Sequence, residues 1–276
     1  MAPTLNLVGA GHVGRVLGRL FASSGAFTVQ DVLTRGADSA RAAVAFIGAG
    51  RVCASVEAMR PASVWMLAVG DDAIVPACER LAAAGQLDGA IVFHCSGAKA
   101  SSELAAARAA GALVASVHPV RSFADPQAVA ADFAGTYCGV EGDAAALAVL
   151  EAGFGTIGAR TVRIDPAQKT VYHAAAVFAS NYLVTVLDAA LRAYVAAGVP
   201  EQVARELARP LASEALANVF RLGPEAALSG PVARGDHATV ARQQEAVSRW
   251  HPATGQLYEA LVAPTADLAR RKRGVS

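Results

Sequence analysis

The chain has 276 residues, of which 54 % are hydrophobic and 17 % are charged, and its formal net charge is +1. This is enough apolar sequence for a large core in one or two domains, so we expect a soluble globular protein. The near balance of charges excludes a general attraction to nucleic acid or to an anionic membrane. The four cysteines form no C-x-x-C pair, and we expect reduced thiols, a cytoplasmic location, no signal peptide and no metal.

The clearest motif is a glycine-rich turn near the start of the chain. A short apolar run leads into a Gly-x-Gly-x-x-Gly pattern formed by Gly9, Gly11 and Gly14. In a dinucleotide-binding unit the first glycine allows a sharp turn, the second lets the backbone approach a pyrophosphate, and the third lets the next helix pack closely. The pyrophosphate binds free N–H groups of that helix, whereas the alternative is a turn with a purely structural role. The predicted cofactor contacts are Gly9, Ala10, Gly11, His12, Val13 and Gly14.

The end of the second expected strand indicates which dinucleotide is bound. This strand, residues 27–33, ends in Leu33-Thr34-Arg35, about twenty residues beyond the glycine turn, where the adenosine ribose is read. The hydroxyl of Thr34 and the guanidinium of Arg35 suit a 2′-phosphate, which an acidic residue there would repel. We therefore predict NADP(H) rather than NAD(H). Asp31 lies inside the strand, and we expect it at an edge or facing solvent.

Strands and helices alternate as far as residue 164, and only helices are expected beyond it. The expected strands are 27–33, 63–69, 90–94, 113–119, 136–140 and 160–164, with a weak one near 52, and the helices are 38–47, 101–110, 143–152, 201–222, 236–250 and one ending near 272. This order predicts an α/β fold, a doubly wound and mainly parallel Rossmann sheet, with a second, all-helical domain. Because Asp165-Pro166 interrupts the pattern, we predict an NADP-binding domain at 1–165 and a helical substrate domain at 166–276.

Polar groups follow two of the expected strands at the edge where such sheets bind ligands. One strand runs into His94-Cys95-Ser96-Gly97 and another into His118-Pro119. We expect Val69, Ser96 and Gly97 to contact the cofactor, and His118 to act as a proton donor or substrate ligand near the nicotinamide. The alternative for His118 is a structural histidine bonded to a loop carbonyl. A metal site built from His94, Cys95, His118 and Cys138 lacks ligand spacing.

The first helix of the second domain carries a polar stripe. Lys169, His173, Ala176 and Ser180 are spaced by four, three and four residues, which places them on one face of an α-helix. Because burying polar groups without partners is costly, we expect this face to line a cleft between the domains. The alternative is a solvent-exposed Lys169 and a satisfied core histidine at His173. Candidate substrate contacts are Ser180, Asn181 and Arg234.

The same helix has the length and composition of a membrane span. Residues 170–187 include no charged side chain, and eighteen residues approach the thickness of a bilayer core. The stretch nevertheless contains a histidine and an asparagine and is the only one of its kind. We expect a long helix buried at the centre of the second domain, with the membrane span as the alternative.

The order of the motifs resembles a known family over nearly the whole chain. The glycine turn is followed by Asp71-Asp72, His94-Cys95-Ser96-Gly97, His118-Pro119-x-x-Ser122-Phe123, Tyr172-His173-Ala174-Ala175-Ala176 and Ser229-Gly230-Pro231-x-x-Arg234-Gly235-Asp236. This order resembles bacterial Rossmann-like proteins that carry a C-terminal domain of unknown function, DUF2520. They are similar in turn to the NADP oxidoreductase superfamily, which includes 6-phosphogluconate dehydrogenase, ketopantoate reductase and pyrroline-5-carboxylate reductase.

The resemblance implies a set of catalytic residues and a dimer. That superfamily often uses a Lys-x-x-x-Asn motif, to which Lys169-x-x-x-His173 corresponds here. Lys169 is thereby implied as the general acid or base toward a carbonyl oxygen, with His173 in place of the substrate-orienting asparagine. The resemblance also implies a homodimer formed through the helical domain.

Together these observations predict an NADP(H)-dependent oxidoreductase that transfers hydride to or from a small polar metabolite in the interdomain cleft. Lys169, His173 and His118 are the predicted catalytic residues. The acceptor is a carbonyl, an imine or a deazaflavin. The alternative is an NADP(H)-binding sensor or partner protein with little turnover.

Overall fold

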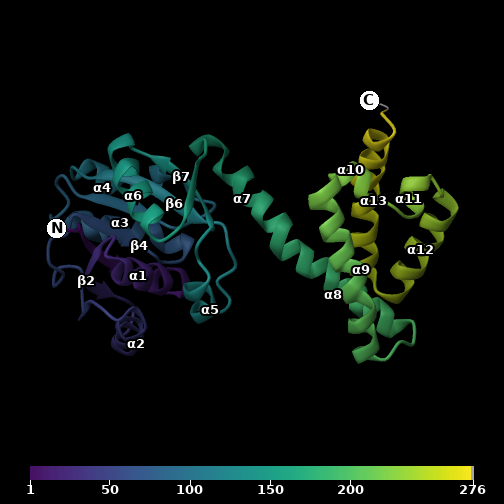
Figure 1. Cartoon of the computed structure of the whole chain (residues 1–276), viewed down its shortest axis with the longest axis horizontal. Coiled ribbons are helices and arrows are strands. Elements are labelled where there is room, and N and C mark those ends of the chain that lie inside the picture. Colours follow the sequence, from purple (N-terminus) through teal and green to yellow (C-terminus); the bar gives the residue numbers. More distant parts are fainter. Residues whose placement is uncertain (275–276) are drawn as a thin grey trace. The chain divides into compact units, whose positions relative to one another are not determined.

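The computed structural model describes residues 1–274. The chain forms two compact units, one spanning Met1–Ala179 and the other beginning at Ser180 (Figure 1). The first unit contains the whole sheet, and the second contains only helices. The sheet ends at residue 163, close to the predicted boundary at 165, whereas the compact units divide at 179, within the helical segment that follows.

The first unit is built on an eight-stranded sheet in the order β3-β2-β1-β4-β5-β6-β7-β8. All neighbouring strands are parallel except β6 and β7. The prediction of a doubly wound, mainly parallel Rossmann sheet is therefore confirmed. The strands are β1 Thr4–Val8, β2 Thr28–Leu33, β3 Arg51–Cys53, β4 Val64–Leu67, β5 Ile91–His94, β6 Leu113–Pro119, β7 Tyr137–Gly142 and β8 Arg160–Arg163.

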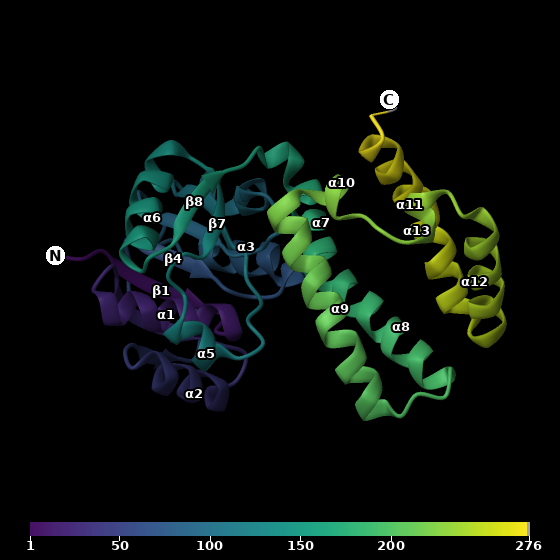
Figure 2. The same ribbon diagram turned by 45° about the vertical axis from the view of Figure 1, so that its right-hand side comes forward.

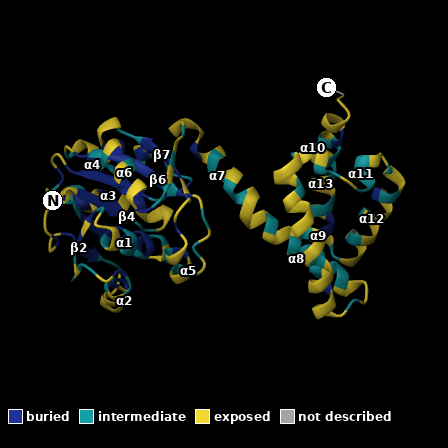
Figure 3. Cartoon of the chain, in the orientation of Figure 1, coloured by how far each residue is buried: buried dark blue, intermediate teal, exposed yellow. Residues whose placement is uncertain are grey.

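Helices cover both faces of this sheet. They are α1 His12–Ser24, α2 Ala37–Ile47, α3 Ile74–Ala83, α4 Ala105–Ala109, α5 Pro126–Ala131 and α6 Ala144–Thr156. Successive side chains of β4 alternate between two hydrophobic clusters: Met66 packs with α1, α2, α5 and α6, and Trp65 packs with α3 and α4. Both faces of the inner strands are consequently buried, as the dark sheet in Figure 3 shows. This explains why the strands are apolar runs and do not alternate with polar residues.

The helical region begins with a short turn, Pro166–Gln168, and α7, Lys169–Val177. A π-helical turn, Phe178–Tyr182, then separates α7 from α8, Leu183–Ala196. The predicted stripe from Lys169 to Ser180 assumed continuous α geometry, and the structure corrects it: the π turn widens the helix and changes the direction of the side chains after Val177.

The expectation that this helix is buried at the centre of a domain is wrong. Pro166–Ala196 is long and apolar enough to cross a membrane by length and composition alone, yet none of its most apolar window is buried. Val171, Phe178 and Val184 are exposed within it. The physical reason is that the segment runs across the division between the two compact units and so does not lie within the core of either.

The second unit is a set of helices that largely follows the prediction. They are α8, α9 Glu201–Leu222, α10 Pro224–Ala227, α11 Pro231–Arg234, α12 His237–Trp250 and α13 Pro252–Lys272. The predicted helices 201–222 and 236–250 agree with α9 and α12 to within one residue. Helices α8 and α9 lie side by side, as do α12 and α13 (Figure 2). Much of the apolar surface of α9 is exposed, including Leu207, Leu211 and Phe220.

Candidate functional site

A cavity of about 910 Å³ opens beside the ends of β1, β2, β3 and β4. Because these strands are parallel, the residues that follow them meet at one edge of the sheet, where ligands of such folds bind. Six of the predicted cofactor residues line this cavity: Gly9, Ala10, Gly11, Thr34, Arg35 and Val69. The structure therefore brings the glycine turn and the predicted ribose-reading residues into one place.

The glycine turn has the geometry that its three glycines predict. Gly9 has a φ of +86°, and a Cβ there would lie 2.6 Å from the carbonyl oxygen of Ala68. A Cβ on Gly14 would lie 2.7 Å from the Cβ of Ala68, so this glycine lets α1 pack against the segment after β4. A Cβ on Gly11 would meet nothing within 4 Å, which leaves its backbone open to the cavity. This turn fits a dinucleotide pyrophosphate.

The start of α1 offers a positively polarised surface to an anion. Its N-cap residue, Gly11, provides no side-chain cap, and the first turn contains no acidic residue. Its first N–H groups are thus available to a phosphate. Arg15 adds a full positive charge at the cavity wall, where its guanidinium donates to the carbonyl of Ala10 at 3.2 Å. The His12 ring instead bonds the carbonyl of Phe123 at 2.6 Å, which ties the loop after β6 to the glycine turn.

The opposite part of the cavity carries the side chains predicted to read the ribose. The hydroxyl of Thr34 donates to the carbonyl of Gly36 at 2.8 Å, and Ser39 adds a second hydroxyl to the wall. Arg35 is exposed and makes no ion pair within residues 1–274. A free guanidinium at this position suits a dianionic 2′-phosphate.

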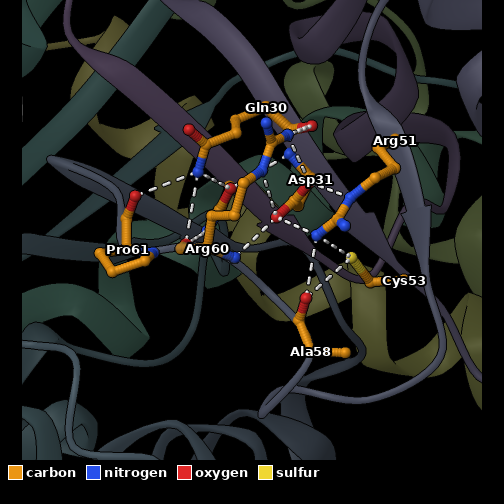
Figure 4. Close-up of polar contacts among 8 residues, drawn as sticks. Gln30, Asp31, Arg51, Cys53, Ala58, Arg60 and Pro61 are labelled. Carbon is orange, nitrogen blue, oxygen red and sulfur yellow. Dashed lines mark hydrogen bonds and ion pairs between the residues drawn. The ribbon is translucent and has the colours of Figure 1, made fainter.

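The expectation that Asp31 lies at an edge or faces solvent is wrong, because its side chain is fully buried. Figure 4 shows how two arginines converge on its carboxylate. Arg51 donates from Nε and Nη2 at 3.0 and 3.1 Å, and Arg60 donates from Nη2 at 2.7 Å and from its backbone N–H at 2.7 Å. Burial alone would raise the pKa of Asp31, but the hydrogen bonds from Arg60 and Arg51 outweigh it and hold the pKa well below its usual range.

The Asp31 network also shapes the cavity. Arg51 pairs across from Asp31 on β3, and Arg60 lies at the far end of the loop that follows β3. The guanidinium of Arg51 reaches the carbonyl of Ala58 in this loop at 2.9 Å. The intervening residues Ala54, Ser55, Val56 and Glu57 form part of the cavity wall. The buried carboxylate therefore positions the part of the cavity wall that this loop forms.

A second buried ionic cluster joins α7 to the sheet. Lys169 and Glu141 are 1 % and 2 % exposed, and Lys169 Nζ lies 3.2 Å from Glu141 Oε1 and donates to the hydroxyl of Ser116. Glu141 also accepts from the N–H and the hydroxyl of Ser101, at 2.8 and 2.6 Å. Burial lowers the pKa of Lys169, and Glu141 opposes that shift. The alternative of a solvent-exposed Lys169 is wrong because the ion pair permits its burial.

Next to this cluster, two histidines meet at Gly97, and one of them contacts Tyr172. His118 Nδ1 lies 3.1 Å from the hydroxyl of Tyr172, and the rings of His118 and His173 are 5.5 Å apart. A Cβ on Gly97 would lie 2.8 Å from His118 Nε2 and would overlap His173 Nδ1. Burial, and then the neighbouring His173, lower the pKa of His118 to about 4, so the ring is neutral at pH 7. Both alternatives for these histidines are wrong: the partner of His118 is a phenol and not a loop carbonyl, and His173 Nδ1 is buried without a partner among residues 1–274.

The other polar groups after β5 have structural partners. His94 is fully buried, accepts from the N–H of Ser96 at Nδ1 and bonds the carbonyl of Ala100 through Nε2. The Ser96 hydroxyl accepts from the N–H groups of Ala98 and Lys99, which fixes the turn that contains Gly97. Among residues 1–274 there is no group of three or more His, Cys, Asp or Glu side chains that could hold a metal.

The substrate candidates on the helical side belong to the second compact unit. The Ser180 hydroxyl donates to Asn181 Oδ1 at 2.9 Å within the π turn. Arg234 is exposed at the end of α11. Their part in a substrate site stays a prediction.

The sequence interpretation missed several residues of the site. The cavity is also lined by Arg15, Ser39, Ser55, Glu57, Asp71, Asp72 and Arg80, and the buried clusters include Ser101, Ser116, Glu141 and Tyr172. A usable signal existed for Glu141, as for Asp31: a carboxylate inside an otherwise apolar strand requires a buried partner. The cavity residues had no such signal, because Arg15, Ser39 and Arg80 lie on α1, α2 and α3 and the others follow β3 and β4, so which of them reach the cavity depends on tertiary packing.

Two domain families match the chain. Residues 3–119 match a Rossmann-like domain, and residues 136–265 match the domain of unknown function DUF2520. These matches confirm the resemblance that the motifs indicated. No curated protein matches the sequence.

Solved structures share the same architecture. A Bacteroides fragilis protein provisionally named an NADP oxidoreductase, BF3122, is 22 % identical with a TM-score of 0.79, and the match covers 96 % of this chain and 98 % of that one. Protein TM1727 from Thermotoga maritima is 26 % identical with a TM-score of 0.75, covering 98 % and 100 %. An imine reductase from Myxococcus stipitatus, solved with NADP+, is 17 % identical with a TM-score of 0.68, covering 99 % and 95 %.

Proposed function

We propose that this protein, which belongs to the Rossmann-like proteins with a DUF2520 domain, is an NADP(H)-dependent reductase of a small polar carbonyl or imine compound. The observation that carries the proposal is the cavity of the first unit. It combines an open glycine turn, an uncapped helix N-terminus and the free guanidinium of Arg35. Similar folds have been solved with NADP+ bound, which supports the same cofactor here.

Each part of the cavity has a role in holding the cofactor. The backbone around Gly11 and the start of α1 would bind the pyrophosphate, while Thr34 and Arg35 would bind the 2′-phosphate. Val69, Ser96 and Gly97 follow the neighbouring strands β4 and β5, and we propose that the nicotinamide lies beside them. When bound, the cofactor supplies or accepts the hydride, and the protein supplies orientation and electrostatics.

His118 and His173 are the proposed groups for the substrate. Because the His118 ring is neutral at pH 7, it suits a hydrogen bond to the substrate better than full proton transfer. We assign proton exchange to His173, whose Nδ1 has no partner among residues 1–274. Lys169 remains a catalytic candidate through its charge, although its ion pair with Glu141 holds it inside the protein.

The burial of Lys169 favours a second candidate function. A lysine held between Glu141 and Ser116 is not free to exchange a proton with a substrate. The protein would then be an NADP(H)-binding sensor or partner protein with little turnover. Oxidation of NADPH that depends on an added cyclic imine or ketone supports the reductase, and its absence across a broad panel of such compounds supports the sensor.

Two broader expectations belong to the same proposal. We propose a homodimer, because the helical unit exposes apolar side chains on α8 and α9 that include Val184, Leu211 and Phe220. We also propose a cytoplasmic location, which suits a reductase that uses the NADPH pool. Light scattering and fractionation of cells test these two expectations.

The cofactor assignment is tested by calorimetric titration of the wild type and of Arg35→Ala with NADPH and NADH. We expect the variant to bind NADPH about 30-fold more weakly, which corresponds to about 2 kcal/mol for a lost charged hydrogen bond, with NADH binding unchanged. Arg41→Ala is the matched control, because this exposed arginine of α2 pairs with Asp38 outside the cavity wall. Failure of the wild type to bind any dinucleotide would overturn the proposal.

A further inference from the structure

Ser116 connects the buried ion pair to the turn that follows β5. On β6 it is directly paired with His94 of β5 on one side and with Glu141 of β7 on the other. Its side chain is fully buried. Its hydroxyl group contacts Lys169 Nζ and lies 3.5 Å from the carbonyl oxygen of Ser96. One hydroxyl group therefore joins the ion pair of α7 and β7 to the end of β5.

The chemistry of these groups fixes the direction of both hydrogen bonds. In its ion pair with Glu141, Lys169 is an ammonium group without a lone pair, so it donates to the Ser116 oxygen. A backbone carbonyl has lone pairs and no proton, so Ser116 donates to Ser96. This second hydrogen bond is long, but accepting from a cation polarises the hydroxyl group and strengthens its donation. The charge of Lys169 thus acts on the Ser96 carbonyl while Lys169 stays in its ion pair.

Each polar atom of Ser96 has a hydrogen-bond partner. Its N–H donates to His94 Nδ1 at 3.2 Å, and its carbonyl accepts from Ser116. Its hydroxyl oxygen accepts from the N–H groups of Ala98 and Lys99 at 3.2 and 3.0 Å. Only the bond from Ser116 comes from another part of the chain, because the other three lie within the turn and the strand end before it. Ser116 is therefore the side chain that fixes this turn relative to β6.

The turn lies against the two histidines of the proposed substrate site. A Cβ on Gly97 would lie 2.8 Å from His118 Nε2 and would overlap His173 Nδ1. Ser116 and His118 are two residues apart on β6, so their side chains lie on the same face of the sheet and their Cα atoms are about 7 Å apart. One strand therefore carries both the residue that holds the turn and the histidine proposed to bind the substrate.

We infer that Ser116 is a positioning residue for hydride transfer, which fixes the turn of Ser96 and Gly97 beside His118 and so aligns the nicotinamide with the substrate. The alignment rests on the proposed reductase function, whereas the anchoring of the turn does not. Lys169 contributes through Ser116 and needs no proton exchange with the substrate, which agrees with its burial. A fixed geometry of two reactants is a large part of many rate enhancements.

The anchoring of the turn is tested by hydrogen exchange of the full-length protein without cofactor. Ser116→Ala removes the hydroxyl group, so the N–H groups of Ala98 and Lys99 should exchange about tenfold faster. Ser24→Ala is the control and should leave both rates unchanged, since Ser24 also donates to a backbone carbonyl, at 3.3 Å, but in the last turn of α1. Unchanged rates in a folded Ser116→Ala protein would overturn the inference. Ser116→Cys, whose thiol is a weak donor, decides the question in the same way where Ser116→Ala does not fold.

Calorimetric titration tests the consequence for the cofactor. NADPH carries the nicotinamide, whereas adenosine 2′,5′-bisphosphate carries the 2′-phosphate and no nicotinamide. Ser116→Ala should bind NADPH about tenfold more weakly and the bisphosphate as tightly as the wild type does. An equal loss for both ligands, or no loss for either, would contradict a position beside the nicotinamide. If the wild type binds neither ligand, the proposed function fails, and hydrogen exchange still decides the anchoring of the turn.

A kinetic measurement tests the alignment itself. With a carbonyl or imine compound found by screening, and with saturating NADPH, Ser116→Ala should lower kcat on the order of 100-fold. The KM for the compound should change little, because His118 and His173 keep their side chains. An unchanged kcat would overturn the alignment. If the wild type turns over no compound, the reductase proposal and the alignment fail together, and the anchoring of the turn is still decided by hydrogen exchange.

Discussion

Two strands of the first unit each bury one carboxylate, Asp31 in β2 and Glu141 in β7. The two carboxylates differ in how exposed their cationic partners are. Asp31 is paired with Arg51 and Arg60, whose side chains are about half exposed at 53 % and 52 %. Glu141 is paired with Lys169, which is 1 % exposed. The arginines that pair with Asp31 contact water, and we call this the open network. Lys169 and Glu141 are both excluded from water, and we call them the closed pair.

The two networks hold different parts of the first unit in place. The Asp31 network holds the loop after β3, which forms part of the cavity wall and where water has access to the arginines. The Glu141 network joins α7 to β6 and β7, next to the histidines at Gly97. A pair excluded from water depends on both partners, because removing one leaves the other charge in a poorly polarisable environment without compensation. The closed pair should therefore be much more sensitive to the loss of one member.

The largest expected loss in unfolding free energy follows from removing one member of the closed pair. Lys169→Met removes the cation and leaves the Glu141 carboxylate buried without it, which should lower the free energy of unfolding by about 4 kcal/mol. Urea denaturation measures this loss. The double variant Lys169→Met/Glu141→Gln should be less destabilised than the single variant, because no unpaired charge remains.

A matched control is the exposed pair of Arg192 and Asp188 on α8, at 45 % and 61 % exposure. Arg192→Met should change the unfolding free energy by no more than about 0.5 kcal/mol. An equally small effect of Lys169→Met would show that the Lys169–Glu141 pair is hydrated in solution, and the distinction between the two networks would then fail.

A smaller effect is expected on the open network. Asp31→Asn weakens several charged hydrogen bonds, but Arg51 and Arg60 can turn to water, so the loss in unfolding free energy should be about 2 kcal/mol. NADPH should also bind more weakly, because the loop after β3 loses its anchor. Denaturation and calorimetry on the same preparation measure both quantities. Asp38→Asn, at an exposed carboxylate on α2, is the control and should change neither.

The same comparison shows what the sequence could predict. The mainly parallel sheet, the alternation of strands with helices and the glycine turn follow from local patterns, since apolar runs, turn glycines and their spacing are determined within a few residues. The partners of Asp31 could not be predicted, because Arg51 and Arg60 lie twenty or more residues away and meet it only in the folded sheet. The stripe was predicted from Lys169 to Ser180 and keeps α-helical spacing within α7 as far as Ala176, but the π turn beyond Val177 depends on packing that helical periodicity does not include.

The smallest effect is the dependence of the Asp31 contribution on pH. Its pKa is held below the usual value in the folded state, so the unfolded chain takes up a proton first as the pH falls. The stability that Asp31 adds is complete above its ordinary pKa of about 3.9 and declines below it, by up to about 1.4 kcal/mol for each pH unit. The difference in unfolding free energy between the wild type and Asp31→Asn should consequently be constant from pH 7 to 5 and shrink between pH 4 and 3. A difference that stays constant to pH 3 would mean that the two arginines do not hold the carboxylate in solution as Figure 4 shows them.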